Sequence, residues 1–218
     1  QMYITGPAVI REVTGEQVTA EELGGVESHA HYSGVVHFVA ADDADAVAIA
    51  RRLLDFLPAN NTEDPPFIAE LHEAALYPDD GFSAIVPADP REPYDMREVV
   101  QRTLDRGDFL EVQAAYAANL VIGFGRVAGR TVGVLANQPM VRAGALDIDA
   151  SDKAARFIRF CNAFNIPLLT FVDVPGFLPG VRQELGGIIR HGAKMLFAYA
   201  AATVPKVTIV VRKAYGGA

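Results

Sequence analysis

The sequence predicts an α/β fold with a parallel sheet, and three observations support this prediction. From residue 151 onward, two helical patterns alternate with two short strands rich in β-branched residues. Pro167 and Pro205 stop the two helices and leave only short connectors before each strand. The strand at 168–172 is almost continuously apolar, as strands buried on both faces are. Because successive parallel strands are joined by right-handed helical crossovers, this order predicts a parallel sheet.

The N-terminal third is expected to hold a short strand, a helix and a domain boundary. Residues 2–5 are predicted as the strand. Residues 42–57 are predicted as a helix because an Asp-rich start precedes apolar residues at helical spacing. A polar, turn-rich stretch without periodicity at 58–66 and a stretch rich in Pro, Asp and Gly at 78–93 together indicate the boundary.

The middle of the chain is predicted to form a helix and three strands. The helix covers about 95–106 and closes on Gly107, which suits the C′ position of a helix end. The strands are expected at 109–113, 119–127 and 131–137. Residues 128–130 then join the last two strands as a hairpin turn.

The last third supplies the helices and strands of the parallel sheet. Ser151 and Asp152 are predicted to start the first helix, which turns Cys161 toward the core. Helical spacing assigns the basic residues Lys153, Arg156 and Arg159 to another face. The remaining elements are a strand at 168–172, a helix at 186–202 and a strand at 206–211.

The net charge of −8 conceals two regions of opposite sign. Residues 1–150 carry 10 basic and 24 acidic side chains, whereas residues 151–218 carry 9 basic and 3 acidic ones. The acidic body argues against general nucleic-acid binding, which needs a basic face across the domain. The basic end favours a small polyanion such as a coenzyme phosphate, with solvated helix faces as the alternative.

Hydropathy and cysteine content indicate the cellular compartment in which the protein is expected. No stretch of about 18 apolar residues is present, so we expect no membrane span. The single cysteine, Cys161, excludes a disulfide framework and indicates the cytoplasm or, in a eukaryote, the mitochondrial matrix. Its apolar helical position favours core packing over a catalytic thiol. The chain begins at Gln1 with no visible signal peptide, so we expect further sequence before it.

Three motifs in the sequence resemble known binding sites but lack features that those sites require. Residues 123–129 form a GxGxxxG inside a strand pattern with no helix after it, which argues against a dinucleotide site. Residues 173–176 match the DxxG of GTP-binding proteins, but no GxxxxGK[ST] loop precedes them. His29, His31 and His37 are assigned structural roles, because no further ligand is evident and His37 lies in an apolar strand pattern. No metal site is predicted.

What remains is a set of small residues at the expected ends of two neighbouring strands. Val174-Pro175-Gly176 follows one strand, Gly186-Gly187 opens the next helix, and Gly216-Gly217-Ala218 follows the next strand. Ligands of open parallel sheets bind outside the carboxyl ends of the strands. Without bulky side chains, backbone N–H groups there can approach and stabilise an oxyanion. This inventory favours chemistry without a side-chain nucleophile, with simple tight turns as the alternative.

These residues belong to an ordered run of motifs that covers essentially the whole chain. The run resembles the carboxyltransferase (β) subunits of biotin-dependent acyl-CoA carboxylases, most closely the propionyl-CoA carboxylase β subunits. The matching motifs include Tyr94-Asp95-Met96-Arg97-Glu98, Ala136-Asn137-Gln138-Pro139, Phe171-Val172-Asp173-Val174-Pro175-Gly176-Phe177-Leu178-Pro179-Gly180, Gly186-Gly187-Ile188-Ile189-Arg190-His191-Gly192-Ala193-Lys194 and Lys213-Ala214-Tyr215-Gly216-Gly217-Ala218. The N-terminal part agrees more loosely.

The resemblance implies a crotonase-like (ClpP/crotonase) ββα superhelix, which the family uses twice, as an N-terminal and a C-terminal half. Residues 1–70 are then expected to be the end of the N-terminal half, and residues 71–218 much of the C-terminal half. Family members are usually hexamers whose active sites lie between the N-half of one subunit and the C-half of another. They work with a biotin carboxylase and a biotin carboxyl carrier, and neither nucleic acid nor membrane is an expected partner.

The activity that the resemblance implies is carboxyl transfer from carboxybiotin to the α-carbon of an acyl-CoA, in the first instance from propionyl-CoA to methylmalonyl-CoA. In the family's mechanism the ureido oxygen of biotin and the enolate oxygen of the thioester need stabilising, and backbone amides do this. The resemblance assigns the biotin-side pair to Gly217 and Ala218. It assigns the biotin approach to Gly176, Phe177, Gly186 and Gly187, and the acyl-CoA-binding stretch to the region from Asp105 to Gln138.

The sequence departs from the family at both ends. The family's acyl-side oxyanion glycines lie upstream of Gln1, and a residue that selects the acyl chain lies past Ala218, so we expect a middle fragment that is inactive alone. Two alternatives keep the fold: a methylmalonyl-CoA decarboxylase or transcarboxylase subunit, and a non-catalytic truncated paralogue that assembles with a complete subunit. A crotonase-type hydratase or isomerase would need a catalytic Glu that the sequence does not place.

Overall fold

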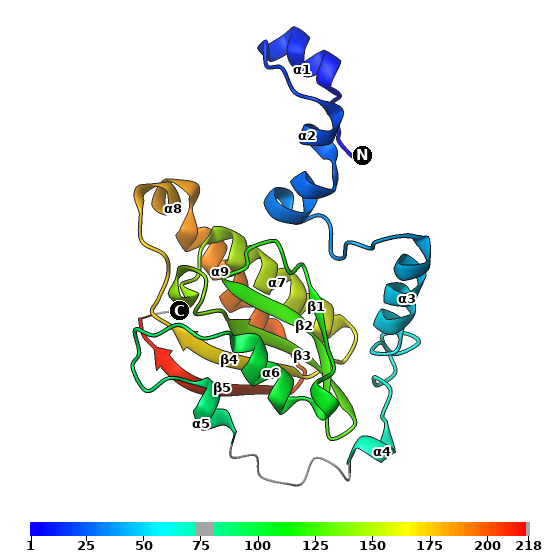
Figure 1. Ribbon diagram of the computed structural model, residues 1–218, viewed down its shortest axis with the longest axis vertical. Helices are drawn as coiled ribbons and strands as arrows, with labels where there is room; N and C mark the ends of the chain where they lie inside the picture. Colours follow the sequence, from blue (N-terminus) through cyan, green and yellow to red (C-terminus); the bar gives the residue numbers. More distant parts are fainter. Residues whose placement is uncertain (73–80, 217–218) are drawn as a thin grey trace.

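The computed structural model of the protein describes residues 1–72 and 81–216. Its body is one five-stranded sheet with the spatial order β1-β2-β3-β4-β5 (Figure 1). The strands are β1 (Phe109–Val112), β2 (Leu120–Val127), β3 (Arg130–Asn137), β4 (Leu168–Val174) and β5 (Lys206–Ala214). The predicted α/β class and the positions of all five of these strands are confirmed.

The sheet is mixed, with one antiparallel part and one parallel part. β1, β2 and β3 form an antiparallel meander, and Val127 pairs with Arg130 across the two-residue turn between β2 and β3. β3, β4 and β5 are parallel, as the helix–strand alternation predicts. The long helices α7 (Ile148–Ala163) and α9 (Ile188–Ala201) are the crossovers between these parallel strands.

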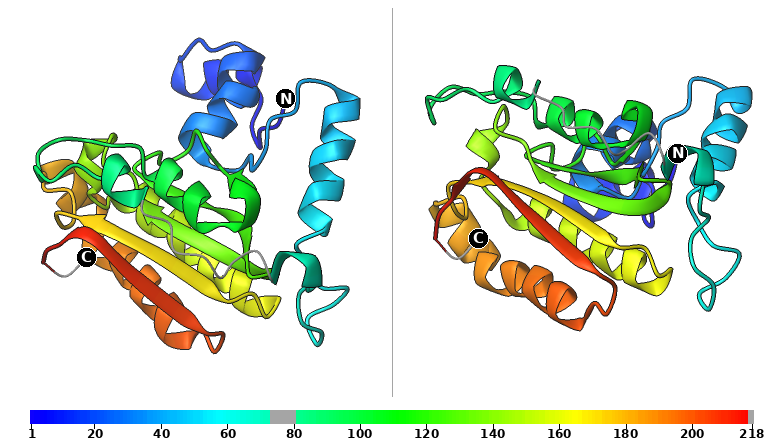
Figure 2. Two further views of the ribbon diagram at one scale, coloured as in Figure 1. Left: turned by 60° about the horizontal axis from the view of Figure 1, so that its bottom comes forward. Right: turned by 90° about the horizontal axis from the view of Figure 1, so that it is seen from below.

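Helices cover both faces of the sheet. α7 and α9 lie on one face, and α6 (Met96–Thr103) lies on the other (Figure 2). The remaining helices among the described residues are short or peripheral: α1 (Pro7–Thr14), α2 (Ala20–Gly24), the π-helix η1 (Ser28–Ser33), α3 (Asp43–Leu54), α4 (Ala69–His72), α5 (Phe82–Ile85), η3 (Asp105–Gly107), η4 (Arg142–Gly144) and α8 (Val181–Gly186). No helix among them is long and apolar enough to cross a bilayer.

Two apolar layers result, because neighbouring strand residues face opposite sides of the sheet. Ile122 and Leu135 pack with the α7 side chains in one layer. Val121 and Val134, one residue earlier in each strand, pack with α6 in the other layer. Continuous apolar strands are therefore needed in the centre of this sheet, which explains the unbroken run at β4.

The N-terminal segment differs from its prediction. Residues 2–5 form no strand, because the Met2 N–H donates to the Gly24 carbonyl and the chain then turns into α1. α1 and α2 stand away from the sheet, and α3 runs beside it (Figure 1). The division of the chain at residue 70 into two halves stays a prediction, and the second predicted linker, 78–93, lies partly outside the described residues.

Three predicted details of the C-terminal region are also wrong. α7 begins at Ile148 rather than at Ser151, because Asp147 caps it by accepting the Ala150 N–H at 2.9 Å. The short helix α8 precedes α9, which itself starts at Ile188. Lys153 does not share the exposed face of Arg156 but is buried under the β1–β2 connection.

Cys161 lies in the core, as predicted, and it limits the size of the residue opposite. Its buried thiol has a raised pKa because burial disfavours the thiolate. A Cβ at Gly133 of β3 would lie 2.5 Å from the Cys161 Sγ. Gly133→Ala should therefore lower the free energy of unfolding by about 1–3 kcal/mol through overpacking.

The double variant Gly133→Ala/Cys161→Ala tests this steric cause. Removing the sulfur makes room for the new methyl group, so urea denaturation should recover at least half of the lost free energy. The clash would be contradicted if Gly133→Ala lowers the free energy of unfolding by the same amount in the Cys161→Ala background as in wild type.

Candidate active site at the ends of β4 and β5

The carboxyl ends of β4 and β5 lie side by side. Val174 pairs with Ala214, and the Tyr215 N–H donates to the Val174 carbonyl at 3.1 Å. Each strand then leaves the sheet on a glycine with positive φ, Gly176 at 134° and Gly216 at 68°. A Cβ on Gly216 would meet nothing within 4 Å, so the backbone there is open to a ligand.

The segment after β4 is held against the body by its backbone. The Leu146 N–H donates to the Gly176 carbonyl at 3.1 Å, and the Leu178 N–H donates to the Leu146 carbonyl at 2.7 Å. The Phe177 ring packs on α9, where a Cβ at Gly192 would come within 2.9 Å of the ring. Two of the four residues predicted for the biotin approach are thereby fixed beside the end of β5.

The other two predicted residues form the junction of α8 and α9. Gly187 caps α9 with a φ of 88° and no side chain, so the first N–H groups of the helix have no side-chain cap. A Cβ at Gly186 would lie 2.6 Å from the Ile148 Cδ1, so this junction packs closely on the start of α7. Gly187 precedes α9, and Gly192 of the same helix lies against the Phe177 ring.

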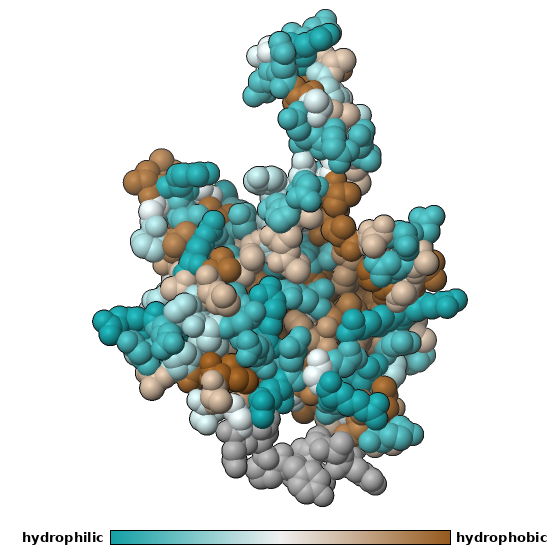
Figure 3. Space-filling view, in the orientation of Figure 1, coloured by the Kyte–Doolittle hydropathy of each residue, from teal (hydrophilic) through white to brown (hydrophobic). Residues whose placement is uncertain are grey.

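A polar cavity of about 640 Å³ lies between the Leu178–Gln183 stretch and the start of α7. Arg142 and Asp147, which form an ion pair, line this cavity. The Ile148 N–H donates to the Gln183 Oε1 at 3.0 Å, which ties α8 to the N-terminus of α7. The α8 side chains of Val181 and Leu185 are exposed, Val181 also lines this cavity, and brown atoms mark the α8 end of the molecule in Figure 3.

The two predicted catalytic residues, Gly217 and Ala218, lie outside the described residues. The structure describes the chain up to Gly216, the residue immediately before them. Their roles therefore stay predictions.

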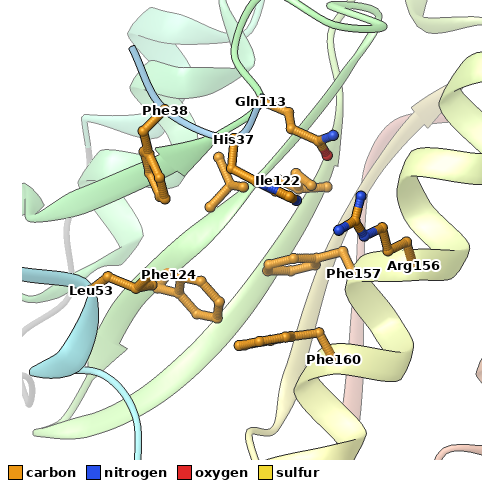
Figure 4. Close-up of a pocket in the computed structure, with 10 residues that line it drawn as sticks. His37, Phe38, Leu53, Gln113, Ile122, Phe124, Arg156, Phe157 and Phe160 are labelled. Atoms are coloured by element: carbon orange, nitrogen blue, oxygen red, sulfur yellow. The ribbon is translucent and has the colours of Figure 1, made fainter. Parts of the chain in front are cut away.

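The stretch predicted to bind acyl-CoA, from Asp105 to Gln138, comprises η3 and the antiparallel strands β1, β2 and β3. An apolar cavity of about 320 Å³ opens between this stretch and α7 (Figure 4). Ile122 and Phe124 line it from the sheet, and Phe157 and Phe160 line it from the helix. The cavity has the size and composition of a small-ligand pocket.

His37 lies at the rim of this apolar cavity, in a loop rather than in the predicted strand. Burial and the charge of Arg156 lower its pKa, so the ring is held neutral near pH 7. The His29 ring is hydrogen-bonded to the Met2 carbonyl and the Ser33 hydroxyl, contacts that agree with the structural role assigned to it.

A buried carboxylate, Asp173, lies directly beneath the paired strand ends. It is 0% exposed and accepts hydrogen bonds from the Tyr94 hydroxyl at 2.9 Å and the Arg212 Nε at 3.0 Å. The Lys213 backbone N–H also donates to it, at 3.1 Å. Burial and the neighbouring carboxylate raise the pKa of Tyr94, so this phenol stays protonated and donating.

In the sequence Asp173 stands in a DxxG pattern and in one of the family motifs, and neither of these predicts its contacts with β5. Two signals could have found it. An acid stands inside an otherwise apolar strand, where an unpaired charge is costly, and two cations, Arg212 and Lys213, stand at the same end of the next strand. Adjacent parallel strands bring such positions together.

A family model described as the carboxyl transferase domain matches residues 1–218. The chain belongs to the carboxyl transferase domain family. It is 60% identical over 216 residues to the methylmalonyl-CoA carboxyltransferase 12S subunit of Propionibacterium freudenreichii subsp. shermanii, covering 99% of this chain and 41% of that subunit. It is 57% identical over 224 residues to the propionyl-CoA carboxylase beta chain of Saccharopolyspora erythraea, covering 100% of this chain and 41% of that one.

Solved carboxyl transferase structures share the fold. A transcarboxylase 12S crystal structure, described as a hexamer with hydrolysed methylmalonyl-coenzyme A bound, matches with a TM-score of 0.96 and 60% identity over 99% of this chain and 42% of its own. The geranyl-CoA carboxylase beta subunit of P. aeruginosa matches with a TM-score of 0.58 and 37% identity over 96% of this chain and 38% of its own. The predicted crotonase-like fold is confirmed. The chain spans about two fifths of the length of these relatives.

Proposed function

We propose that this carboxyl transferase domain belongs to an enzyme that moves a carboxyl group from carboxybiotin to the α-carbon of an acyl-CoA, with propionyl-CoA as the first-choice acceptor. The observation that carries the proposal is the family match over all 218 residues. Relatives at 55–57% identity that are named propionyl-CoA carboxylase beta chain or carboxyltransferase subunit support the choice of substrate.

The exits of β4 and β5 fit a planar ureido ring. Gly176 and Gly216 bring backbone close to the surface with no side chain in the way, since a Cβ on Gly176 would meet only the Tyr215 carbonyl, at 3.9 Å. When bound, carboxybiotin supplies the carboxyl group. The residues of this chain hold the ring: we assign the ureido oxygen to the backbone N–H groups of Gly217 and Ala218, and the approach to Gly176, Phe177, Gly186 and Gly187. Such preorganised donors contribute about 10²–10³ in rate each.

The acyl-CoA is assigned to the stretch from Asp105 to Gln138. The apolar cavity of Figure 4 opens against this stretch and supports an apolar ligand there. The basic C-terminal third supplies the positive potential that attracts the coenzyme's phosphates. The proposed partners of the complete enzyme are a biotin carboxylase, a biotin carboxyl carrier and further copies of itself in a hexamer.

A carboxylation assay tests the proposal. The complete reading frame that contains this chain is combined with its biotin carrier, biotin carboxylase, ATP and bicarbonate, and offered acetyl-, propionyl-, butyryl- and long-chain acyl-CoA. We expect the highest kcat/KM for propionyl-CoA, at least about tenfold above the long-chain substrate, because a misfitting methylene costs about 1–3 kcal/mol. Absence of carboxylation with every acyl-CoA would refute the proposal.

A second candidate uses the same site in the opposite direction. The identities to the 12S carboxyltransferase and, at 57%, to the methylmalonyl-CoA decarboxylase subunit alpha of Veillonella parvula favour a methylmalonyl-CoA decarboxylase or transcarboxylase subunit. The genes beside the reading frame separate a carboxylase from a decarboxylase, because the first works with a biotin carboxylase and the second with a membrane pump. The reading frame also decides whether the chain is a non-catalytic paralogue.

A further inference from the structure

We propose that the buried carboxylate of Asp173 is a positioning residue that sets the register of the end of β5, and thereby the point at which the backbone enters the biotin-side oxyanion site. This inference rests on the proposed function for its effect on catalysis. The contacts of Asp173 that support it are made by described residues of β5 and of the loop before α6.

The register of the two strands changes at Asp173. Val172 pairs with Val210, whereas Val174 pairs with Ala214. Three residues of β5, Val211 to Lys213, therefore face Asp173 alone. A bulge of this kind leaves backbone groups without ladder partners and re-aims the strand. Here the side chain takes the place of the missing ladder, because the Lys213 N–H donates to the Asp173 Oδ1.

The carboxylate is held by both of its oxygens. Oδ1 accepts the Lys213 N–H, while Oδ2 accepts the Tyr94 hydroxyl and the Arg212 Nε. On the other strand side, the Asp173 N–H donates to the Asn137 Oδ1 at 3.2 Å. A fully buried charge of this kind is tolerated only because it is paired and hydrogen-bonded on every side.

Arg212 extends the connection to the loop before α6. Its Nη1 donates to the carbonyls of Asp89 at 2.8 Å and Glu92 at 3.0 Å, and its guanidinium lies 4.9 Å from the centroid of the Tyr94 ring. The Lys213 Nζ donates to the Pro90 carbonyl at 3.3 Å. Asp173 is thus the common acceptor that joins β4, β5 and this loop, and its partner Arg212 lies four residues before the exposed Gly216.

Replacing the Asp173 carboxylate by an amide of the same shape should allow the register of β5 against β4 to change. In Asp173→Asn one oxygen still accepts the Lys213 N–H, but the amide nitrogen cannot accept from Arg212, which is left without its acid partner. The end of β5 then shifts, and a displacement of about 1 Å at a catalytic donor costs about 10²-fold in rate. Tyr94→Phe removes a single bond to the same carboxylate and should cost less, about 3–10-fold.

The experiment compares Asp173→Asn and Tyr94→Phe with the control Asp152→Asn in the complete enzyme. Asp152 also holds two partners, the His191 Nδ1 at 2.8 Å and the Lys194 Nζ at 2.9 Å, but it joins α7 to α9. Three quantities are measured: kcat for carboxyl transfer, KM for propionyl-CoA, and hydrogen exchange of the Lys213 and Tyr215 amides. Tyr94→Phe keeps the test valid if Asp173→Asn does not fold.

We expect kcat to fall about 10²-fold in Asp173→Asn and less in Tyr94→Phe, with KM for propionyl-CoA within twofold of wild type and faster exchange at both amides. The control should keep kcat and the exchange rates within twofold. Unchanged kcat and exchange in both Tyr94→Phe and a folded Asp173→Asn would overturn the inference. An inactive wild type would instead overturn the proposed function, and the exchange measurement would still decide the register.

Discussion

Lys153→Met is expected to lower the free energy of unfolding by about 3 kcal/mol. The Lys153 side chain is 2% exposed, and its Nζ donates to the backbone carbonyls of Gln113 at 3.0 Å, Tyr116 at 2.6 Å and Leu120 at 2.7 Å. Methionine keeps the length of the stem but leaves these carbonyls without their donor. Each buried, unsatisfied acceptor costs about 1–3 kcal/mol, reduced where water can enter.

The matched control is Lys194→Met. Lys194 also sits on a helix of the same face, but its side chain is 40% exposed and bonds Asp152 at 2.9 Å. An exposed pair of this type contributes at most about 1 kcal/mol. Urea denaturation followed by circular dichroism should separate the two variants by about 2 kcal/mol. Equal losses would mean that the buried lysine does not organise the β1–β2 connection.

The same lysine should make stability depend on pH. Burial lowers the pKa of Lys153 to about 7, from 10.5 in the unfolded chain. Between these values the unfolded chain binds a proton that the folded protein does not, so the stability rises with pH through this window. The difference in unfolding free energy between wild type and Lys153→Met should therefore widen from pH 7 to pH 9. A constant difference would mean that the carbonyl oxygens hold the ammonium form.

Asp147→Ala is the second large effect, with an expected loss of about 3 kcal/mol. Asp147 is 2% exposed; its Oδ1 accepts the Ala150 N–H at 2.9 Å and the Asn119 Nδ2 at 3.2 Å, and its Oδ2 pairs with Arg142. The substitution removes a helix cap and one of the two acceptors of the buried Asn119 amide, which keeps only its bond to the Ala145 carbonyl, and it removes the acid partner of the half-exposed Arg142. The cap accounts for about 1 kcal/mol and the lost contacts to Asn119 and Arg142 for the rest.

Asp42→Ala provides the comparison, because it removes a cap alone. Asp42 caps α3 by accepting the Asp45 N–H at 2.9 Å, and it is exposed. Thermal and urea unfolding should give a loss of about 1 kcal/mol for this variant. If Asp147→Ala costs no more than Asp42→Ala, the contacts of Asp147 beyond the cap contribute nothing.

The sequence predicts the sheet well because local signals agree with the fold. β4 is buried on both faces and has an almost continuous apolar sequence, and Ala128 and Gly129 mark the hairpin turn between β2 and β3. The sequence also predicts where the chain leaves β4 and β5, because Gly176 and Gly216 adopt positive φ values that favour glycine.

Other features depend on partners that are distant in the chain. Helical periodicity assigns Lys153 to a polar face, but carbonyl oxygens of the β1–β2 connection accept hydrogen bonds from its Nζ, so the residue can be buried. The hydrogen-bond partners of Asp173, Arg212 and Lys213, belong to β5 and are distant from it in the sequence. The six residues of α8 are too few for a helical period, and their apolar side chains are exposed.

We propose that the chain at the paired ends of β4 and β5 holds the ureido oxygen of biotin. A crystal structure of the complete enzyme with biotin bound tests this most directly. We expect the ureido oxygen within about 3 Å of the backbone nitrogens of Gly217 and Ala218, the distance of a normal hydrogen bond, with Gly176 and Phe177 beside the ring. A biotin ring bound elsewhere, with these amides directed away from it, would contradict the account.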